Sequence, residues 1–246
     1  MLPIRDHNPS TRRPYVTWAL IGANVLIFLS YWPNMDNVYE MRMLFKDWAI
    51  IPLLITQGEN THTLVTAMFL HGGFLHLAGN VLFLWIFGDN LEDTMGHFWF
   101  LAFYLATGVI SGVAQVMIDP SSVIPMVGAS GAIAGVMGGY LLLYPKAKID
   151  ILFFFVFIFR IIPVPAWLML GVWFGIQVVG GLGADPDMGG VAYWAHAGGF
   201  LAGVVLVLPF LGRRGGADHW RKTHGAPPHP EYAYRRTSIP VVRRRK

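Results

Sequence analysis

Residues 128–139 read GASGAIAGVMGG, an apolar stretch in which Gly131 and Gly135 stand four residues apart. This spacing places small residues on one face of a helix, where they allow two membrane helices to pack closely. Gly199 and Gly203 repeat the pattern in a later apolar segment. The two stretches therefore predict a pair of tightly packed helices inside a membrane-embedded bundle.

The composition supports a membrane protein. Hydrophobic residues make up 54% of the 246 residues and charged residues 13%, and the mean hydropathy is +0.50. This balance is typical of a chain that crosses the bilayer several times. Cysteine is absent, which excludes disulfides, thiolate catalysis and cysteine-type zinc sites. His71 and His76 have no clustered third ligand, so we expect no metal.

Six apolar runs set the expected number of membrane spans. A helix needs about 20 apolar residues to cross the hydrocarbon core. The runs lie at residues 15–31, 72–89, 97–117, 130–144, 167–182 and 192–211. They predict an all-α, polytopic six-helix membrane domain over residues 15–211.

Residues 151–162 form another strongly apolar run, which contains Arg160 and is followed by Pro163. Its twelve residues are too few to cross the bilayer as a helix. We expect an interfacial or re-entrant segment here, and a seventh span is the alternative.

The distribution of positive charge predicts the orientation of the chain. With six spans, all but two of the 18 Lys and Arg residues fall on one side; the exceptions are Arg42 and Lys46. Positive loops stay in the cytoplasm, so we expect both termini there. Residues 1–14 would form a short N-terminal tail, and residues 212–246 a basic, disordered tail. The basic tail suits anionic lipid better than nucleic acid.

Four polar residues fall at the outer ends of the second, fourth and sixth spans. They are His76, Asn80, Ser130 and His196. The fourth span is short: fifteen residues make about 22 Å of helix, against a core of about 30 Å. The loop at residues 121–129 should therefore enter the protein from the outer side, beside a water-filled cavity.

The pairing of Ser130 with His196 predicts nucleophilic catalysis. Either residue alone could be purely structural and form a hydrogen bond between two helices. Together they provide a hydroxyl nucleophile and a base that takes its proton. His76, Asn80 and the Ser130 backbone amide are candidates to stabilise an oxyanion. No carboxylate lies in an outer half-span, so a catalytic dyad is expected rather than a triad. His71 would hold the loop that precedes the second span.

Three motifs in order resemble the rhomboid family of intramembrane serine proteases, with a match over residues 63–203. They are His71-x4-His76-x3-Asn80, Gly128-Ala129-Ser130-Gly131 and Ala195-His196-x2-Gly199-x3-Gly203. The resemblance implies a six-span bacterial-type protease that needs no cofactor and resides in the inner (plasma) membrane. Ser130 would be its nucleophile and His196 its general base.

Two departures from the family pattern stand out. His62 and Thr63 occupy the stretch where many relatives carry a Trp-Arg pair. Ala134 stands one turn after the serine, where some relatives place an aromatic residue that packs on the catalytic histidine. Tyr193 or Trp194 is therefore expected to hold the ring of His196.

The resemblance also implies the partners. Substrates would be single-span or multi-span membrane proteins, entering between spans two and five and unwinding near the cut. A catalytically inactive relative that binds membrane proteins is one alternative. A transporter is another, but the chain lacks the inverted repeats and interior charges that this class needs.

Overall fold

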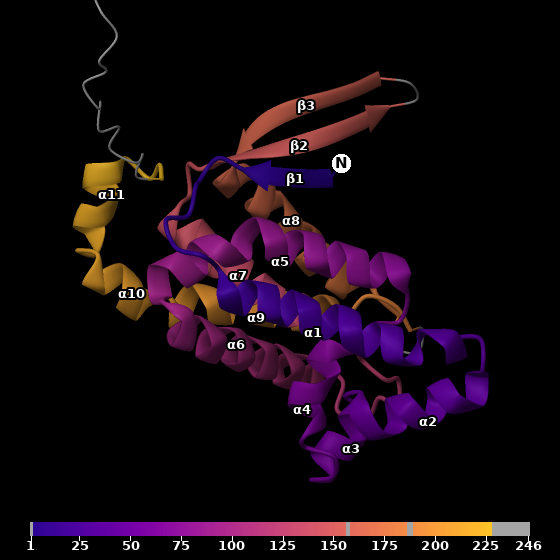
Figure 1. The fold of residues 1–246 in the computed structure, drawn as a ribbon. Coiled ribbons are helices and arrows are strands. Elements are labelled where there is room, and N and C mark those ends of the chain that lie inside the picture. The colour runs from indigo at the N-terminus through magenta and orange to yellow at the C-terminus, as the bar shows by residue number, and fades with distance from the viewer. Residues whose placement is uncertain (1, 156–157, 186–188, 228–246) are drawn as a thin grey trace, which may run out of the picture.

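The computed structural model describes residues 2–155, 158–185 and 189–227 (Figure 1). Its α-helices are α1 (Tyr15–Tyr31), α2 (Val38–Trp48), α3 (Pro52–Thr56), α4 (Thr63–Thr66), α5 (Phe74–Met95), α6 (His97–Ile118), α7 (Ser130–Leu143), α8 (Ala166–Gly183), α9 (Tyr193–Leu206), α10 (Leu208–Arg213) and α11 (Ala217–Thr223). Two 3-10 helices, η1 (Trp32–Asn34) and η2 (Ala67–Phe69), and three strands, β1 (Leu2–Asp6), β2 (Lys148–Phe155) and β3 (Ile158–Pro165), complete the fold. The predicted polytopic helical bundle is confirmed.

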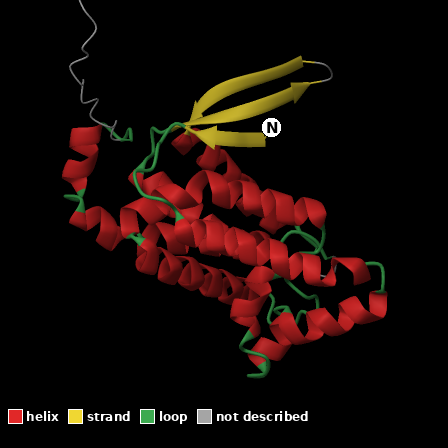
Figure 2. Ribbon diagram, viewed as in Figure 1, coloured by secondary structure: helices red, strands yellow, loops and turns green. Residues whose placement is uncertain are grey.

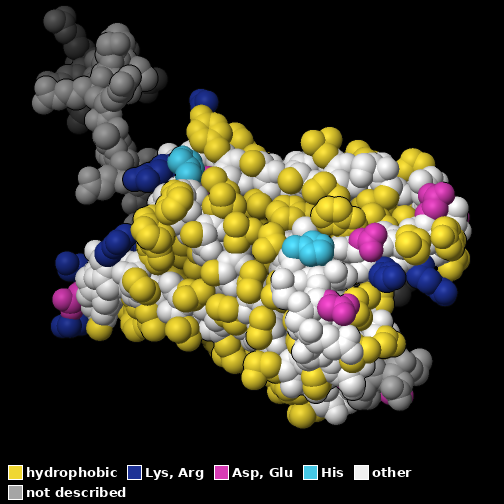
Figure 3. Space-filling view, turned by 90° about the horizontal axis from the view of Figure 1, so that it is seen from below, with side chains coloured by type: hydrophobic (Ala, Val, Ile, Leu, Met, Phe, Trp, Pro, Cys, Tyr) yellow, Lys and Arg dark blue, Asp and Glu magenta, His cyan; other side chains and the backbone are white. Residues whose placement is uncertain are grey.

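Five helical stretches in the described part of the chain are long and apolar enough to cross a membrane. They begin at Tyr15, Phe74, His97, Ala166 and Tyr193. The remaining apolar helix of the bundle, α7, has only 14 residues. On the face shown in Figure 3, hydrophobic side chains form a broad band and charged side chains gather toward the two ends, as lipid contact around a bundle requires.

Helix α7 forms the centre of the bundle. It packs against α5, α6, α8 and α9, and nearly all its residues are buried, including Val136, Met137 and Tyr140. A helix that is apolar on all sides belongs in such a position. In contrast, α8 packs on α9, α7 and the strands β2 and β3, and leaves Val172, Ile176 and Val179 exposed.

The glycine repeats of α7 and α9 meet face to face. A β-carbon on Gly199 would overlap the carbonyl oxygen of Gly131, and one on Gly203 would overlap that of Gly135. Because hydrogen replaces a side chain at both positions, the two backbones come into direct contact. This contact brings the first turn of α7 beside the first turn of α9.

A three-stranded antiparallel sheet lies at one side of the bundle (Figure 2), where only helices were expected. Residues 151–162 were expected to form an interfacial or re-entrant segment or a seventh span. The described part of this run, residues 151–155 and 158–162, instead belongs to the antiparallel strands β2 and β3. Strand β1 pairs with the other edge of β2, and Arg5 Nε lies 2.6 Å from Asp150 Oδ2. Pro163 stands in the edge strand β3, where its missing N–H breaks no ladder.

Part of the C-terminal segment is also ordered. Helix α11 packs back on the bundle, because Trp220 Nε1 donates to the Leu142 carbonyl at 2.9 Å and the buried His219 ring reaches the Leu143 carbonyl at 3.3 Å. The expectation of disorder from Gly212 onward is therefore wrong for residues 217–223. Residues 228–246 of that tail lie outside the described residues.

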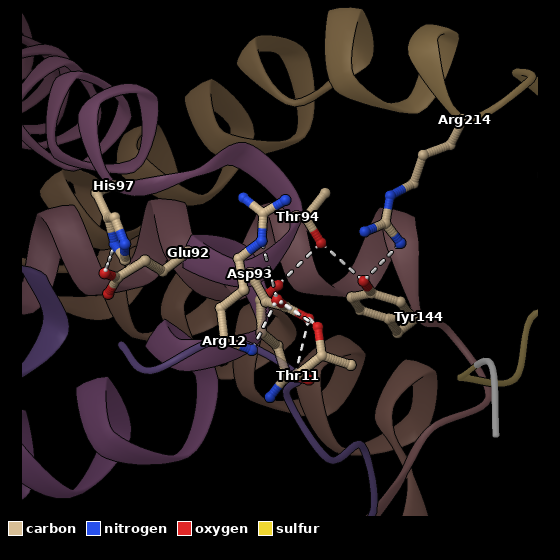
Figure 4. A network of polar contacts seen from close by, with 9 residues as sticks. Thr11, Arg12, Glu92, Asp93, Thr94, His97, Tyr144 and Arg214 are labelled. Carbon is tan, nitrogen blue, oxygen red and sulfur yellow. Dashed lines mark hydrogen bonds and ion pairs between the residues drawn. The ribbon is translucent and has the colours of Figure 1, made fainter. Parts of the chain in front are cut away.

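A polar network joins the segment before α1 to the last turn of α5 and the first residue of α6 (Figure 4). Glu92 accepts from the backbone N–H groups of Val16 and Thr17 at 2.9 and 2.8 Å and pairs with His97 at 2.5 Å. The next residue, Asp93, accepts from Thr11 Oγ1 at 2.9 Å. The last turn of α5 therefore anchors the start of α1, whose first N–H groups have no partner within the helix.

Candidate active site

Ser130 and His196 form a hydrogen-bonded pair. Ser130 is the first residue of α7 and His196 the fourth of α9, and their Oγ and Nε2 atoms are 2.8 Å apart. The contact between Gly131 and Gly199 makes this distance possible, since any β-carbon there would separate the helices. A serine hydroxyl at this distance from an imidazole nitrogen is in place to lose its proton to that nitrogen.

Helix α8 holds the other side of the histidine ring. Gln177 Oε1 lies 2.8 Å from His196 Nδ1, and the Trp173 ring lies 5.9 Å from the imidazole, tilted by 33°. Tyr193 or Trp194 was expected in this packing role, but among the described residues Trp173 makes the ring contact. Gln177 was not expected at the site, although a lone amide in the otherwise apolar helix α8 is a signal that could have identified it.

His76 faces Ser130 from α5. The backbone N–H of Gly72 donates to His76 Nδ1 over a long 3.4 Å, which leaves Nε2 as the protonated nitrogen of a neutral ring. A β-carbon on Gly128 would stand 2.7 Å from His76 Nε2 and 3.6 Å from Ser130 Oγ. The bare backbone of Gly128, with φ of +126°, therefore leaves room for an N–H donor beside the nucleophile.

Asn80 and His71 lie on either side of His76. Asn80 lies one turn along α5, and its Nδ2 donates to the His76 carbonyl at 2.9 Å, which leaves its second N–H free of that bond. His71 is fully buried, and its ring lies 5.2 Å from that of His76. The Tyr31 hydroxyl on α1 accepts from the His71 N–H at 2.7 Å and holds this loop.

These side chains open into one cavity of about 790 Å³. Ser130, His196, His76 and Asn80 all line it, together with the loop at residues 122–127 that precedes α7. Two backbone hydrogen bonds between Ile50 and Met126 fix that loop. The cavity is large enough to admit water and an extended peptide segment beside the hydroxyl of Ser130.

The charges around the pair are sparse. In the described ranges, no group of three or more His, Asp or Glu side chains is placed to hold a metal ion. The acceptor at His196 Nδ1 is the neutral amide of Gln177 rather than a carboxylate. The arrangement places a hydroxyl, an imidazole that can take its proton, an amide bound to that imidazole, and N–H groups of the kind that can stabilise an oxyanion around one cavity.

The fold and the site define a polytopic helical membrane protein with a half-buried serine–histidine pair at the meeting point of two helices. Comparison with protein families gives this class a name. Residues 58–213 match the rhomboid domain, and the chain belongs to the rhomboid family.

Relatives occur in bacteria and in eukaryotic organelles. The chain is 35% identical over 82% of its length to rhomboid protease GluP of Bacillus subtilis. It is 30% identical over 77% of its length to the mitochondrial rhomboid protein 1 of Saccharomyces cerevisiae, and 31% identical over 82% to the chloroplastic rhomboid-like protein 11 of Arabidopsis thaliana. It spans 37% and 51% of the length of the first two.

Proposed function

We propose that the protein is an intramembrane serine endopeptidase that hydrolyses peptide bonds in or next to transmembrane helices of other membrane proteins. The observation that carries this proposal is the 2.8 Å contact between Ser130 Oγ and His196 Nε2 inside a cavity. A packing serine in a membrane helix bonds to a backbone carbonyl of its own helix or to a neighbouring helix. Ser130 instead faces a base with open space beside it.

The reaction follows from the positions of these groups. Ser130 Oγ attacks the substrate carbonyl carbon while His196 Nε2 takes the hydroxyl proton. The oxygen of the tetrahedral intermediate accepts from the Ser130 N–H, which has no intrahelical partner at the first position of α7, and from the N–H donors of His76 and Asn80. His196 then gives its proton to the leaving amine, and a water molecule activated by the same nitrogen hydrolyses the acyl-serine.

The packing supports lateral entry of the substrate between α5 and α8. Helix α8 packs along α9 and α7, and in the described part of the chain no comparable packing joins it to α5. The cavity is lined by residues of both helices, among them Leu75, Phe83 and Trp173. A substrate helix moving in from lipid would reach Ser130 without crossing the bundle, and local unwinding would bring its backbone to the hydroxyl.

The orientation rests on the charge distribution. If α7 is counted as a short span, the total rises from five to six. An even number of spans leaves both termini on one side, and the positive-inside rule then assigns both termini and nearly all Lys and Arg residues to the cytoplasm. The site then opens toward the outer leaflet of a bacterial inner membrane, and the basic C-terminal tail meets anionic lipid. Tagging each terminus and testing its protease protection in oriented vesicles checks this arrangement.

The decisive experiment uses the purified protein in liposomes with a model transmembrane substrate. Ser130→Ala and His196→Ala should each abolish cleavage, while the matched variants Ser121→Ala and His62→Ala, at exposed positions, should cleave as the wild type does. Labelling by a fluorophosphonate should require both Ser130 and His196. Cleavage that persists in Ser130→Ala refutes the proposal, and a wild type that binds the substrate without cutting it indicates an inactive binding factor.

Substrate unwinding has its own test. Helix-breaking or small residues near the cut should speed cleavage, because a regular helix hides its carbonyl carbons within its own hydrogen bonds. A substrate whose span is an uninterrupted poly-leucine helix should be cleaved far more slowly than one with a central glycine pair. Equal rates for the two would contradict the unwinding step.

A further inference from the structure

Helix α8 contributes one amide side chain to the interior of the bundle, that of Gln177. The side chain sits in an otherwise apolar helix and is 6% exposed. Both ends of the amide have partners: Oε1 lies 2.8 Å from His196 Nδ1, and Nε2 lies 3.2 Å from the carbonyl oxygen of Trp173. A buried amide with both ends satisfied holds one orientation.

These partners determine which way the amide points. The Trp173 carbonyl can only accept, so the NH2 end of Gln177 must face it, and the reversed amide would place two acceptor oxygens together. The oxygen of Gln177 therefore faces His196. An oxygen acceptor at Nδ1 requires a proton on Nδ1.

The tautomer of His196 follows in turn. A neutral imidazole carries one N–H, so a proton on Nδ1 leaves a lone pair on Nε2. That lone pair is directed at Ser130 Oγ, 2.8 Å away. The other tautomer would present an N–H to the hydroxyl and could not take its proton.

We propose that Gln177 is a positioning residue that sets the reactive tautomer and ring orientation of His196, and so takes the place of the carboxylate in a catalytic triad. This inference rests on the proposed protease function. It assigns to α8 a part in catalysis: Trp173 packs on the imidazole and Gln177, one turn later, binds it. A neutral amide also avoids the cost of burying a carboxylate in a bilayer.

Gln177 lies behind His196, away from the cavity that would hold the substrate, so replacing it should affect catalysis and not substrate binding. Ser130, His196 and Trp173 line the cavity, whereas Gln177 is not among the described lining residues. Removing its oxygen should therefore lower kcat and leave KM unchanged. Leucine at this position leaves α8 intact, because the Trp173 carbonyl keeps its ordinary backbone partner within the helix.

The titratable groups around His196 are few. His76 faces the cavity from α5, Asp119 from the end of α6, Asp185 from the segment after α8, and Tyr193 from α9. Within α8 no residue titrates near neutral pH. Replacing Gln177 with glutamate would therefore add one new charge next to the imidazole and favour its protonated form.

The first test compares Gln177→Leu, Gln177→Glu and the control Val179→Leu, an exposed position two residues along the same helix. Gln177→Leu should lower kcat about tenfold at unchanged KM. Gln177→Glu keeps an acceptor oxygen, so it should retain most of kcat and move the acidic limb of the pH profile upward by about one unit. Val179→Leu should match the wild type. Equal losses in both Gln177 variants, without a pH shift, indicate a packing role and overturn the proposal.

A second measurement needs no substrate. Nitrogen-15 NMR of labelled histidine, with His196→Ala to assign the signal, should show His196 protonated on Nδ1 in the wild type and a mixture of tautomers in Gln177→Leu. An unchanged Nδ1 signal in that variant overturns the positioning role. Because this readout is independent of cleavage, it judges Gln177 even if Ser130→Ala shows that the proposed protease function is wrong.

Discussion

The carbonyl oxygen of Gly135 on α7 occupies the place where a β-carbon of Gly203 on α9 would stand. No adjustment of a side chain can relieve such an overlap, because the obstructing atom belongs to the backbone of the neighbouring helix. The distance between these two helices also sets the distance between Ser130 and His196, which lie toward their first turns. The packing of α7 on α9 and the distance between Ser130 and His196 are therefore linked.

Gly203→Ala should lower both stability and activity. We expect a loss of about 1–3 kcal/mol in the free energy of unfolding, typical of an overpacked core, and a clear fall in kcat as α9 is displaced. Thermal unfolding in detergent and cleavage in liposomes measure the two effects. Gly175→Ala on α8 is the matched control, because open space surrounds that position. A Gly203→Ala variant with wild-type stability would contradict the packing argument.

Gly128→Ala should act on the oxyanion site. The added β-carbon would stand 2.7 Å from His76 Nε2, at a φ of +126° that alanine rarely adopts. Displacing one oxyanion donor costs about a hundredfold in kcat. The double variant with His76→Ala tests the cause: if Gly128→Ala acts by moving His76, the two losses should be far from additive. Additive losses would instead indicate two independent effects.

Glu92→Gln should destabilise the bundle without changing the chemistry. The carboxylate of Glu92 accepts from two backbone N–H groups and the hydroxyl of Thr17 and pairs with His97. Removing a buried charge with several donors costs about 2 kcal/mol. Chemical denaturation should show this loss, and kcat at low temperature should remain that of the wild type. The exposed Glu59→Gln serves as control.

The sequence predicted the central helix pair because its signal is local. Two glycine repeats, Gly131 with Gly135 and Gly199 with Gly203, mark helix faces that suit close packing. The approach of Ser130 to His196, both in the first turn of their helices, follows from that contact. Charge counting then placed His76 at the same level. Each of these inferences needs only spacing along one helix and a topology.

The features that the sequence did not predict depend on how a helix is rotated about its axis or on pairing between segments far apart in the sequence. Gln177 meets His196 only because α8 turns that face inward, and apolar residues surround the position on all sides, so periodicity did not mark it. Strands β2 and β3 contain runs of consecutive apolar residues instead of alternating apolar and polar ones. The third strand of the sheet, β1, comes from the N-terminal tail. A run of this kind cannot be distinguished from a buried helix by periodicity.

Asp6 should make stability depend on pH. Its Oδ2 accepts from Tyr140 Oη at 2.7 Å and from Asn90 Nδ2 at 3.0 Å. Burial raises the pKa of Asp6 from 3.8 to about 7, although the bond from Tyr140 opposes the rise, and the Asp89 carboxylate adds to it. The folded protein thus holds this proton more tightly than the unfolded chain, so the contribution is complete below about pH 4 and is lost as pH rises to about 7.

Asp6→Asn should remove this dependence, because the amide oxygen still accepts from Tyr140 and Asn90 without carrying a charge. The expected result is a smaller fall in melting temperature between about pH 5 and about pH 8 than in the wild type. Asp36→Asn, at an exposed position, should leave the wild-type slope unchanged. If Asp6→Asn and the wild type lose stability in parallel over this range, another group is responsible for the pH dependence and the Asp6 carboxyl is already ionised in the folded protein at the lower pH.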